Sequence, residues 1–386
     1  MVDRRLLVTY AGGFIGPLAG NTILALVGSL KDAFGVGAGE IFLSIPVYMI
    51  PFVIFQLFSG TISDSLGRKT VAASGFLIYA VGSVLCGWAP DLAFFLGGRF
   101  VQGLGFAFVT PVLHAIVGDF TTDERRGVSM GIFGAVTAGA VATGPLIAGY
   151  MDLIDWRLTF YLIAGLAVLV FLAIQVAFRG SDEERGGARP IGKISIREVV
   201  TNPCVIAVCV AGFLTFFAFI AVISFTADAL SESPFGYDAP TIGLVLFSGG
   251  IGGVFVSPLA GYLVDKVGRF RTGAVGFVFT SLGMLMFYFS NGFWDFILSM
   301  VVVGVAASAV WASLLTLTVE IVPERRGAVA SLFNSSRFLG YALSPVLFLG
   351  IYDSLGVHPI YLIAGLLSLA GVAIMAVMKN LLAKRA

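Results

Sequence analysis

The chain has 386 residues, of which 58% are hydrophobic and only 12% are charged, about half the charged fraction of an ordinary soluble domain. Such a composition favours a protein that is surrounded by lipid. A net charge of +1 excludes a basic field for nucleic acid, and two histidines with three cysteines cannot supply a metal framework of the usual kind. We therefore expect no metal, no cofactor and no nucleic-acid partner.

Apolar runs of membrane-spanning length recur along the whole chain. A helix needs roughly 20 apolar residues to cross about 30 Å of hydrocarbon, because each residue rises about 1.5 Å. The pattern predicts an all-α membrane protein with twelve transmembrane helices. In chain order the runs are 6–30, 41–63, 71–89, 92–120, 128–151, 158–178, 203–226, 240–264, 272–290, 294–320, 328–351 and 360–378.

A long polar stretch separates two halves that repeat each other. We expect an N-terminal six-helix bundle over 1–178, a cytoplasmic linker over 179–200 and a C-terminal six-helix bundle over 201–386. The tetrapeptide Glu-Arg-Arg-Gly that starts at Glu124 returns at Glu324. A duplicated unit predicts two pseudo-symmetric bundles, related by an axis along the membrane normal.

Lysines and arginines concentrate in the loops that would share a side with the amino terminus. Cytoplasmic segments of membrane proteins carry the excess of these residues. With the amino terminus inside, only Lys31 and Arg157 fall in outward loops. We therefore expect a multi-pass protein of the plasma membrane with both termini in the cytoplasm.

The connection between the second and third spans carries a motif, Gly-x-x-x-Asp-x-x-Gly-Arg, that returns in the second half. A short connection of this kind needs a glycine to turn. The motif resembles the loop signature of the major facilitator superfamily, although Ser65 replaces the usual arginine. The resemblance implies a latch between the two halves, with a solvated turn as the alternative. The residues of the two copies are Gly60, Asp64, Gly67 and Arg68, then Asp265, Gly268 and Arg269.

The fourth span contains Arg99-x-x-Gln102-Gly-x-Gly, which resembles another motif of the same family. Arg99 and Gln102 share a helix face because they are three residues apart. We expect them to act in proton coupling or substrate binding. Bracing between helices is the alternative.

The fifth span resembles the signature of drug:proton antiporters within the family, although alanines replace two of its glycines. Small residues allow helices to approach closely, and a Gly-Pro pair provides a kink where helices can flex. The resemblance is compatible with antiport. The residues that carry it are Gly131, Gly144, Pro145 and Gly149.

Arg337 is a basic residue deep inside a span, about 15 Å beyond Gly327 along the eleventh helix. Charge in a bilayer is costly and marks a functional site by default. Asn334 and Tyr341 fall on the same helix face as Arg337. We expect these three residues to line a substrate cavity, with a buried structural pair as the alternative for Arg337.

The first and seventh spans supply further candidates for the cavity. Tyr10 and Asn21 are polar residues around a helix break expected at Pro17. Phe216 belongs to a group of phenylalanines that suits a promiscuous apolar pocket. Because the spans carry no acid at the depths where cation exporters commonly have one, we expect a neutral, zwitterionic or anionic substrate with lipophilic bulk.

Acids at the span boundaries are the candidate proton carriers. Asp119 and Glu320 end the fourth and tenth spans, and Asp228 ends the seventh. For Asp119 and Glu320 the alternative is a salt bridge at the cytoplasmic face.

The resemblance and the motifs together predict a transporter and not an enzyme. We expect a monomer that exports lipophilic or amphiphilic molecules in exchange for protons by alternating access. A facilitator or proton symporter for a small organic anion is the first alternative, and a membrane receptor or sensor without transport is a weaker one. No metalloprotease, phosphate-loop or nucleophile-elbow motif occurs in the sequence.

Overall fold

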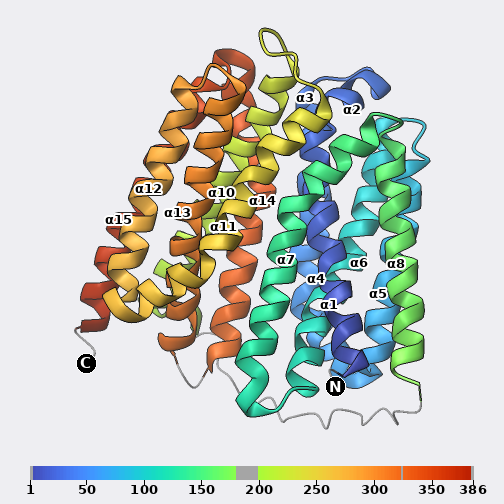
Figure 1. The fold of residues 1–386 in the computed structure, drawn as a ribbon. Coiled ribbons are helices and arrows are strands. Elements are labelled where there is room, and N and C mark those ends of the chain that lie inside the picture. Colours follow the sequence, from blue (N-terminus) through green and yellow to red (C-terminus); the bar gives the residue numbers. More distant parts are fainter. Residues whose placement is uncertain (1–2, 180–198, 323–324, 384–386) are drawn as a thin grey trace. The chain divides into compact units, whose positions relative to one another are not determined.

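The computed structural model describes residues 3–179, 199–322 and 325–383, without the side chains of residues 123, 124, 126, 127, 326 and 327. All regular secondary structure in these ranges is helical (Figure 1). Twelve helical segments of this part of the chain are long and apolar enough to cross a membrane. The predicted all-α membrane fold with twelve spans is therefore confirmed.

The helix boundaries follow the predicted apolar runs to within a few residues in most cases. The first half contains α1 (Arg4–Thr22), the short 3-10 helix η1 (Ile23–Ala25), α2 (Val27–Phe34), α3 (Ala38–Phe42), α4 (Ser44–Leu66), α5 (Arg68–Gly87), α6 (Leu92–Asp119), α7 (Asp123–Asp152) and α8 (Arg157–Ala177). The second half contains α10 (Pro203–Ser231), α11 (Ala239–Val267), α12 (Arg269–Phe289), α13 (Phe293–Glu320), α14 (Arg326–Leu355) and α15 (His358–Ala383).

The first span departs from the predicted pattern. The break expected at Pro17 is wrong, because α1 continues through this residue to Thr22. A proline removes one helix hydrogen bond, but neighbouring helices and polar side chains support such sites in membrane helices. The Asn21 side-chain amide donates a hydrogen bond to the Pro17 carbonyl at 3.1 Å. The α-helix ends five residues later than expected from Pro17, and η1 and α2 follow it.

The chain divides into two compact units. The first comprises Met1–Gly192 and Asp238–Gly243, and the second comprises Lys193–Tyr237 and Leu244–Ala386. The predicted linker, residues 179–200, lies almost entirely outside the described residues. Its limits therefore stay a prediction.

Corresponding helix pairs in the two units pack through corresponding glycines. A Cβ atom added to Gly82 of α5 would lie 2.5 Å from the backbone nitrogen of Gln102 in α6. The equivalent position in the second unit is Gly283 of α12, where an added Cβ would lie 3.0 Å from the backbone nitrogen of Val303 in α13. Only glycine lets the two backbones approach so closely. The sequence repeat is therefore also a repeat of helix packing.

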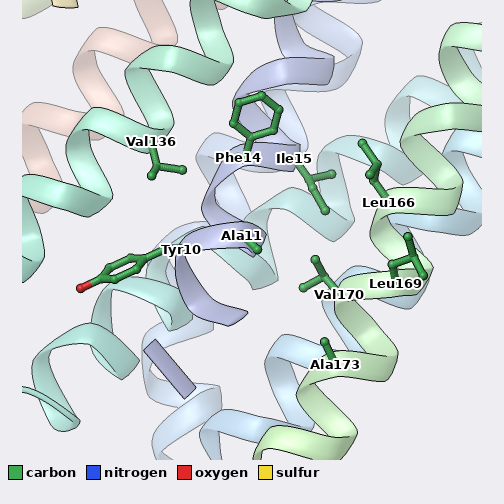
Figure 2. Close-up of a pocket in the computed structure, with 9 residues that line it drawn as sticks. All are labelled: Tyr10, Ala11, Phe14, Ile15, Val136, Leu166, Leu169, Val170 and Ala173. Carbon is green, nitrogen blue, oxygen red and sulfur yellow. The ribbon is translucent and has the colours of Figure 1, made fainter. Parts of the chain in front are cut away.

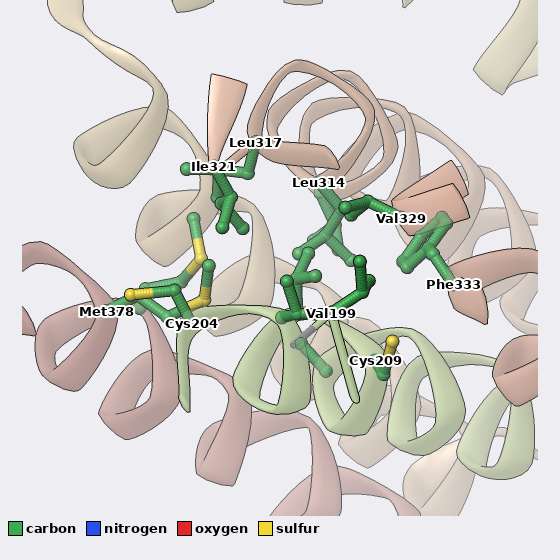
Figure 3. Packing of buried hydrophobic residues seen from close by; sticks show 14 of the residues in the cluster. Val199, Cys204, Cys209, Leu314, Leu317, Ile321, Val329, Phe333 and Met378 are labelled. Carbon is green, nitrogen blue, oxygen red and sulfur yellow. The ribbon is translucent and has the colours of Figure 1, made fainter. Parts of the chain in front are cut away.

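A cluster of buried apolar side chains holds the second unit together (Figure 3). It joins Cys204 of α10, Leu317 of α13, Phe333 of α14 and Met378 of α15, each at most 1% exposed. Lipid tails are as apolar as these side chains, so the cluster stabilises the fold mainly through close van der Waals packing. This packing fixes the helices that carry the site described next.

Candidate functional site

An arginine lies among aromatic rings in the second unit. The Cζ atom of Arg337, on α14, is 4.2 Å from the ring centroid of Phe338. The ring centroids of Trp311 on α13 and Phe216 on α10 lie 4.5 Å and 5.1 Å from the same atom. Rings at these distances attract a cation through their quadrupoles. Three helices therefore position one guanidinium group, and we call these four residues the Arg337 cage.

The Arg337 cage contains no acidic residue. Within the described ranges Arg337 forms no ion pair, and its Nε atom is buried without a hydrogen-bond partner. Aromatic faces offset part of the cost of a buried cation, but they leave the N–H groups at the edge of the guanidinium plane unused. Such a group can receive a carboxylate through two parallel hydrogen bonds.

The cage matches the predicted cavity residues only in part. Phe216 lies beside Arg337 as a member of the cage. The rings around the guanidinium are otherwise those of Trp311 and Phe338, which the sequence analysis did not select. Asn334 is partly exposed one turn earlier on α14, and Tyr341 is 4% exposed one turn later. That these two residues line a cavity together with Arg337 stays a prediction.

A buried carboxylate occupies the other end of the same helix pair. Asp228 on α10 is 2% exposed, and its Oδ2 atom accepts a 2.7 Å hydrogen bond from the hydroxyl of Tyr352 on α14. The Tyr352 ring also packs on Phe225, with ring centroids 4.7 Å apart. Two further titratable groups, Tyr361 and Glu232, lie close enough to interact electrostatically with Tyr352. A buried carboxylate thus links α10 to α14 through this hydrogen bond.

Arg99 is completely buried in the first unit, where it joins three helices. Its Nη1 atom donates to the Gln102 Oε1 atom at 2.9 Å and to the Ala19 carbonyl of α1 at 3.3 Å. Its Nε atom donates to the Ser44 carbonyl of α4 at 3.5 Å. The Tyr48 ring lies 4.2 Å from its Cζ atom. These contacts match the bracing role that the sequence left open.

The network around Arg99 extends into α5. Gln102 donates through Nε2 to the Ser83 hydroxyl at 2.8 Å, and Ser83 donates to the Tyr79 carbonyl at 2.8 Å. One donor is left over, because the Nη2 atom of Arg99 is buried and has no hydrogen-bond partner among the residues described. Arg99 is therefore enclosed by protein.

The two copies of the loop motif each form an ion pair with the acid that ends a later span. In the first unit, Arg68 contacts Asp64 at 2.6 Å and Asp119 at 3.2 Å. In the second, Arg269 contacts Glu320 at 2.7 Å. The salt-bridge alternative for Asp119 and Glu320 thus matches the observed contacts.

The copies also share a turn and differ in one acid. Gly67 and Gly268 precede the two arginines with φ angles of 92° and 96°, which favour glycine. Asp265, the equivalent of Asp64, is exposed and forms no ion pair within the described ranges. Among the described residues, the second copy therefore holds one carboxylate fewer against its arginine.

Comparison with known families decides what kind of molecule carries these features. The model of the Major Facilitator Superfamily matches residues 9–233 and again residues 211–384. The chain belongs to the major facilitator superfamily. It is thus a transporter and a multi-pass membrane protein, as the motifs predicted.

Curated relatives cover most or all of this superfamily member. The quinolone resistance protein NorA of Staphylococcus aureus (strain MSSA476) is 23% identical over 99% of the chain and 98% of its own length. The uncharacterised MFS-type transporter YceJ of Bacillus subtilis (strain 168) is 27% identical over 81% of the chain and 80% of its own length.

The fifth-span glycines, which first suggested the antiporter branch of the superfamily, differ in their surroundings. A Cβ atom added to Gly144 would lie 2.5 Å from the Leu18 carbonyl oxygen of α1, so α7 approaches α1 closely there. Around Gly131 no atom lies within 4 Å of an added Cβ. Pro145 lies inside α7, which is one continuous helix from Asp123 to Asp152. The close contact that small residues allow is present at Gly144 and absent at Gly131.

An apolar pocket of about 540 Å³ lies in the first unit of this superfamily member (Figure 2). Tyr10 is at its rim, with the hydroxyl directed away from the α8 residues, while Asn21 does not line it. Among the described residues that line it, Tyr10 alone has a polar side chain, so the wall of the pocket is almost entirely apolar. Its lining is Tyr10, Ala11, Phe14 and Ile15 of α1, Val136 of α7, and Leu166, Leu169, Val170 and Ala173 of α8.

Metal ligands do not gather anywhere in the described part of the chain: no group of three His, Cys, Asp or Glu residues could hold an ion. Cys86, Cys204 and Cys209 are free and buried. The chemistry available to the candidate site is therefore that of ionic, aromatic and proton-exchanging side chains.

Proposed function

We propose that the protein exports lipophilic or amphiphilic small molecules across the plasma membrane in exchange for protons, by alternating access. Similarity to quinolone resistance proteins favours efflux over uptake. Alternating access in this fold is a rocking of two bundles around a central site. The repeated loop motifs, with Asp64 and Arg68 in one copy and Arg269 in the other, are our candidates for the gate.

The Arg337 cage is the observation that carries the substrate part of the proposal. A cation inside a bilayer costs about 2.5 to 3.5 kcal/mol on insertion scales, so its retention without an acid indicates use. A ligand carboxylate would pair with the guanidinium edge, while a flat apolar body would stack on Phe216 and Trp311. We therefore propose substrates that are anionic, zwitterionic or neutral and that carry aromatic bulk.

Asp228 is the proposed proton carrier. It is buried, it contacts Tyr352, and it lies on the helix pair that also holds the cage. Protonation would remove its charge and convert the carboxylate into a hydrogen-bond donor, which changes the link between α10 and α14. Proton binding and substrate binding would then act on the same two helices.

Transport into proteoliposomes tests the substrate assignment. A fluoroquinolone with a free carboxylate and the lipophilic cation ethidium serve as probes under an imposed pH gradient. We expect Arg337→Gln to lower quinolone transport at least tenfold and Arg337→Lys to retain part of it, with ethidium a poor substrate of both variants and of the unmodified protein. Arg271→Gln, at an exposed arginine near the start of α12, is the matched control. Intact quinolone transport by Arg337→Gln, with ethidium a good substrate, would contradict the proposal.

A facilitator or proton symporter for a small organic anion is the second candidate, and the unpaired guanidinium favours it as well. A luminal pH dye separates the possibilities when substrate enters the vesicles. Antiport makes the lumen alkaline, symport makes it acidic, and a facilitator leaves it unchanged beyond the drift of empty liposomes.

We further propose that both termini lie in the cytoplasm and that the protein works as a monomer. Cysteine labelling of the two tails from either side of the membrane tests the first point. Mass photometry of the purified protein in a lipid nanodisc tests the second.

A further inference from the structure

A second pocket, of about 410 Å³, lies between α5 and α8 of the first unit. It shares no residue with the apolar pocket of Figure 2 or with the Arg337 cage. Its wall consists of Lys69, Thr70, Ala73, Ser74 and Leu77 from α5, with Phe171 and Gln175 from α8.

The pocket is polar at one end and apolar at the other. Lys69 is the second residue of α5, and Gln175 lies two residues before the end of α8, so both belong to the same end of the unit. Leu77 is eight residues beyond Lys69, about 12 Å along the helix axis. Phe171 is one turn before Gln175. The polar side chains therefore lie where the helices leave the membrane, and the apolar ones lie deeper.

Lys69 provides a positive charge that has no acidic partner among the residues the structure describes. Its neighbour Arg68 is paired with two carboxylates, Asp64 and Asp119. Lys69 forms no ion pair in the ranges described and is only partly exposed. The hydroxyl of Ser74, about 7.5 Å further along α5, also lines the pocket and can donate. Phosphate oxygens are the acceptors that such donors suit.

We infer that this pocket binds an anionic phospholipid, with its phosphate at Lys69 and Gln175 and an acyl chain along Leu77 and Phe171. From the membrane surface inward, the pocket presents a cation, then an amide and a hydroxyl, and then apolar side chains. This order complements a lipid, whose anionic head group lies at the surface and whose acyl chains lie deeper. Basic pockets between transmembrane helices bind anionic head groups in this way. In the proposed orientation the polar end faces the cytoplasmic leaflet, where anionic lipids are enriched.

Native mass spectrometry of the full chain in detergent tests the assignment. The probes are dioleoyl phosphatidylglycerol, dioleoyl phosphatidylcholine and inorganic phosphate. We expect one phosphatidylglycerol to stay bound at concentrations where phosphatidylcholine does not. Lys69→Gln should weaken its binding about fivefold, since a basic residue near the membrane surface contributes about 1 kcal/mol. Lys266→Gln, at an exposed lysine outside the pocket, should leave binding unchanged.

The contacts proposed for the acyl chain of the lipid can be tested separately. Phe171→Ala should weaken binding of the long-chain lipid and leave that of a short-chain phosphatidylglycerol unchanged. Equal binding of both head groups, no effect of Lys69→Gln, or displacement of the lipid by inorganic phosphate alone would each overturn the inference. The measurement needs no transported substrate, so its result is independent of the proposed efflux.

Discussion

The hydroxyl of Tyr352 on α14 donates a 2.7 Å hydrogen bond to the buried carboxylate of Asp228 on α10. The same two helices are joined again nearer their centre, where Ser344 donates to the Phe217 carbonyl at 2.6 Å. If Asp228 carries the proton as proposed, protonation would change the contact at one end of this helix pair, while the bond between Ser344 and Phe217 would stay as it is.

The Arg337 cage lies further along the same pair. Phe216 is twelve residues before Asp228 on α10, about 18 Å along the axis, and Arg337 is fifteen residues before Tyr352 on α14, about 22 Å. A change in the tilt of α14 against α10 would alter the distance between Phe216 and the guanidinium. This geometry offers a mechanical route between the proposed proton site and the proposed substrate site.

The first prediction concerns Asp228. Asp228→Asn cannot release a proton, so transport driven by a pH gradient should fall more than tenfold. Exchange of labelled for unlabelled substrate without a gradient should persist, because it requires no net proton movement. Both activities can be measured in the same proteoliposomes.

Two further variants sharpen that test. Asp353→Asn, at an exposed acid next to Tyr352 on α14, should behave like the unmodified protein. Tyr352→Phe removes only the donated hydrogen bond, and should shift the pH optimum of transport while retaining coupling. If Asp228→Asn still concentrates substrate against a gradient, Asp228 is not the proton carrier.

The second prediction concerns the aromatic part of the cage. Trp311→Leu removes the indole that lies 4.5 Å from the Arg337 Cζ atom. Loss of the ring on which the flat body of the substrate is proposed to stack costs about 0.5 to 1.5 kcal/mol, which should raise the dissociation constant for a carboxylate-bearing quinolone about twofold to twelvefold. Tryptophan-independent binding assays, such as scintillation proximity, can measure it. Trp294→Leu, at a 76% exposed tryptophan, provides the comparison, and equal losses in both variants would argue against a role for the cage.

The sequence was sufficient to predict the features that depend on local pattern. Twelve apolar runs and a motif repeated after 201 residues indicated the fold, and the depth of Arg337 within a span singled it out. Phe216 was selected from composition, and it does lie beside Arg337. The fold prediction succeeds because hydropathy and spacing are properties of one segment at a time, whereas the roles of Arg337 and Phe216 stay predictions.

Features that depend on which helices pack together could not be predicted from the sequence. Trp311 reaches Arg337 from α13, and Tyr352 reaches Asp228 across 124 residues of chain. Nothing in the spacing of a single span indicates which faces of two distant helices will meet. The helix break was placed at Pro17 for a related reason, because proline weakens an isolated helix, whereas packing around α1 maintains it.

The third prediction separates two roles for Arg99. If this residue braces helices, Arg99→Gln removes its hydrogen bonds to the Ala19 and Ser44 carbonyls, at about 1.5 to 3 kcal/mol for each bond from a charged group. The melting temperature in detergent should then fall by several degrees, together with the yield of folded protein. Unchanged stability with lost proton dependence of transport would support a coupling role instead.

The last prediction joins the packing of the fold to this network. Gly82 lies against the backbone of Gln102, and a methyl group there would meet the Gln102 nitrogen at 2.5 Å and its Cα atom at 3.0 Å. Backbone atoms cannot rotate away, so Gly82→Ala must push α5 and α6 apart, at about 1 to 3 kcal/mol. Because Gln102 donates to Ser83 and accepts from Arg99, the shift should also weaken the hydrogen bonds around Arg99.

Gly97→Ala, on the same α6 helix with no atom within 4 Å of the added Cβ, should instead stabilise the protein by about 0.5 to 1 kcal/mol through its helix propensity. The melting temperature should thus fall in Gly82→Ala and rise in Gly97→Ala. A change in the same direction in both variants would mean that the close contact between α5 and α6 does not limit stability.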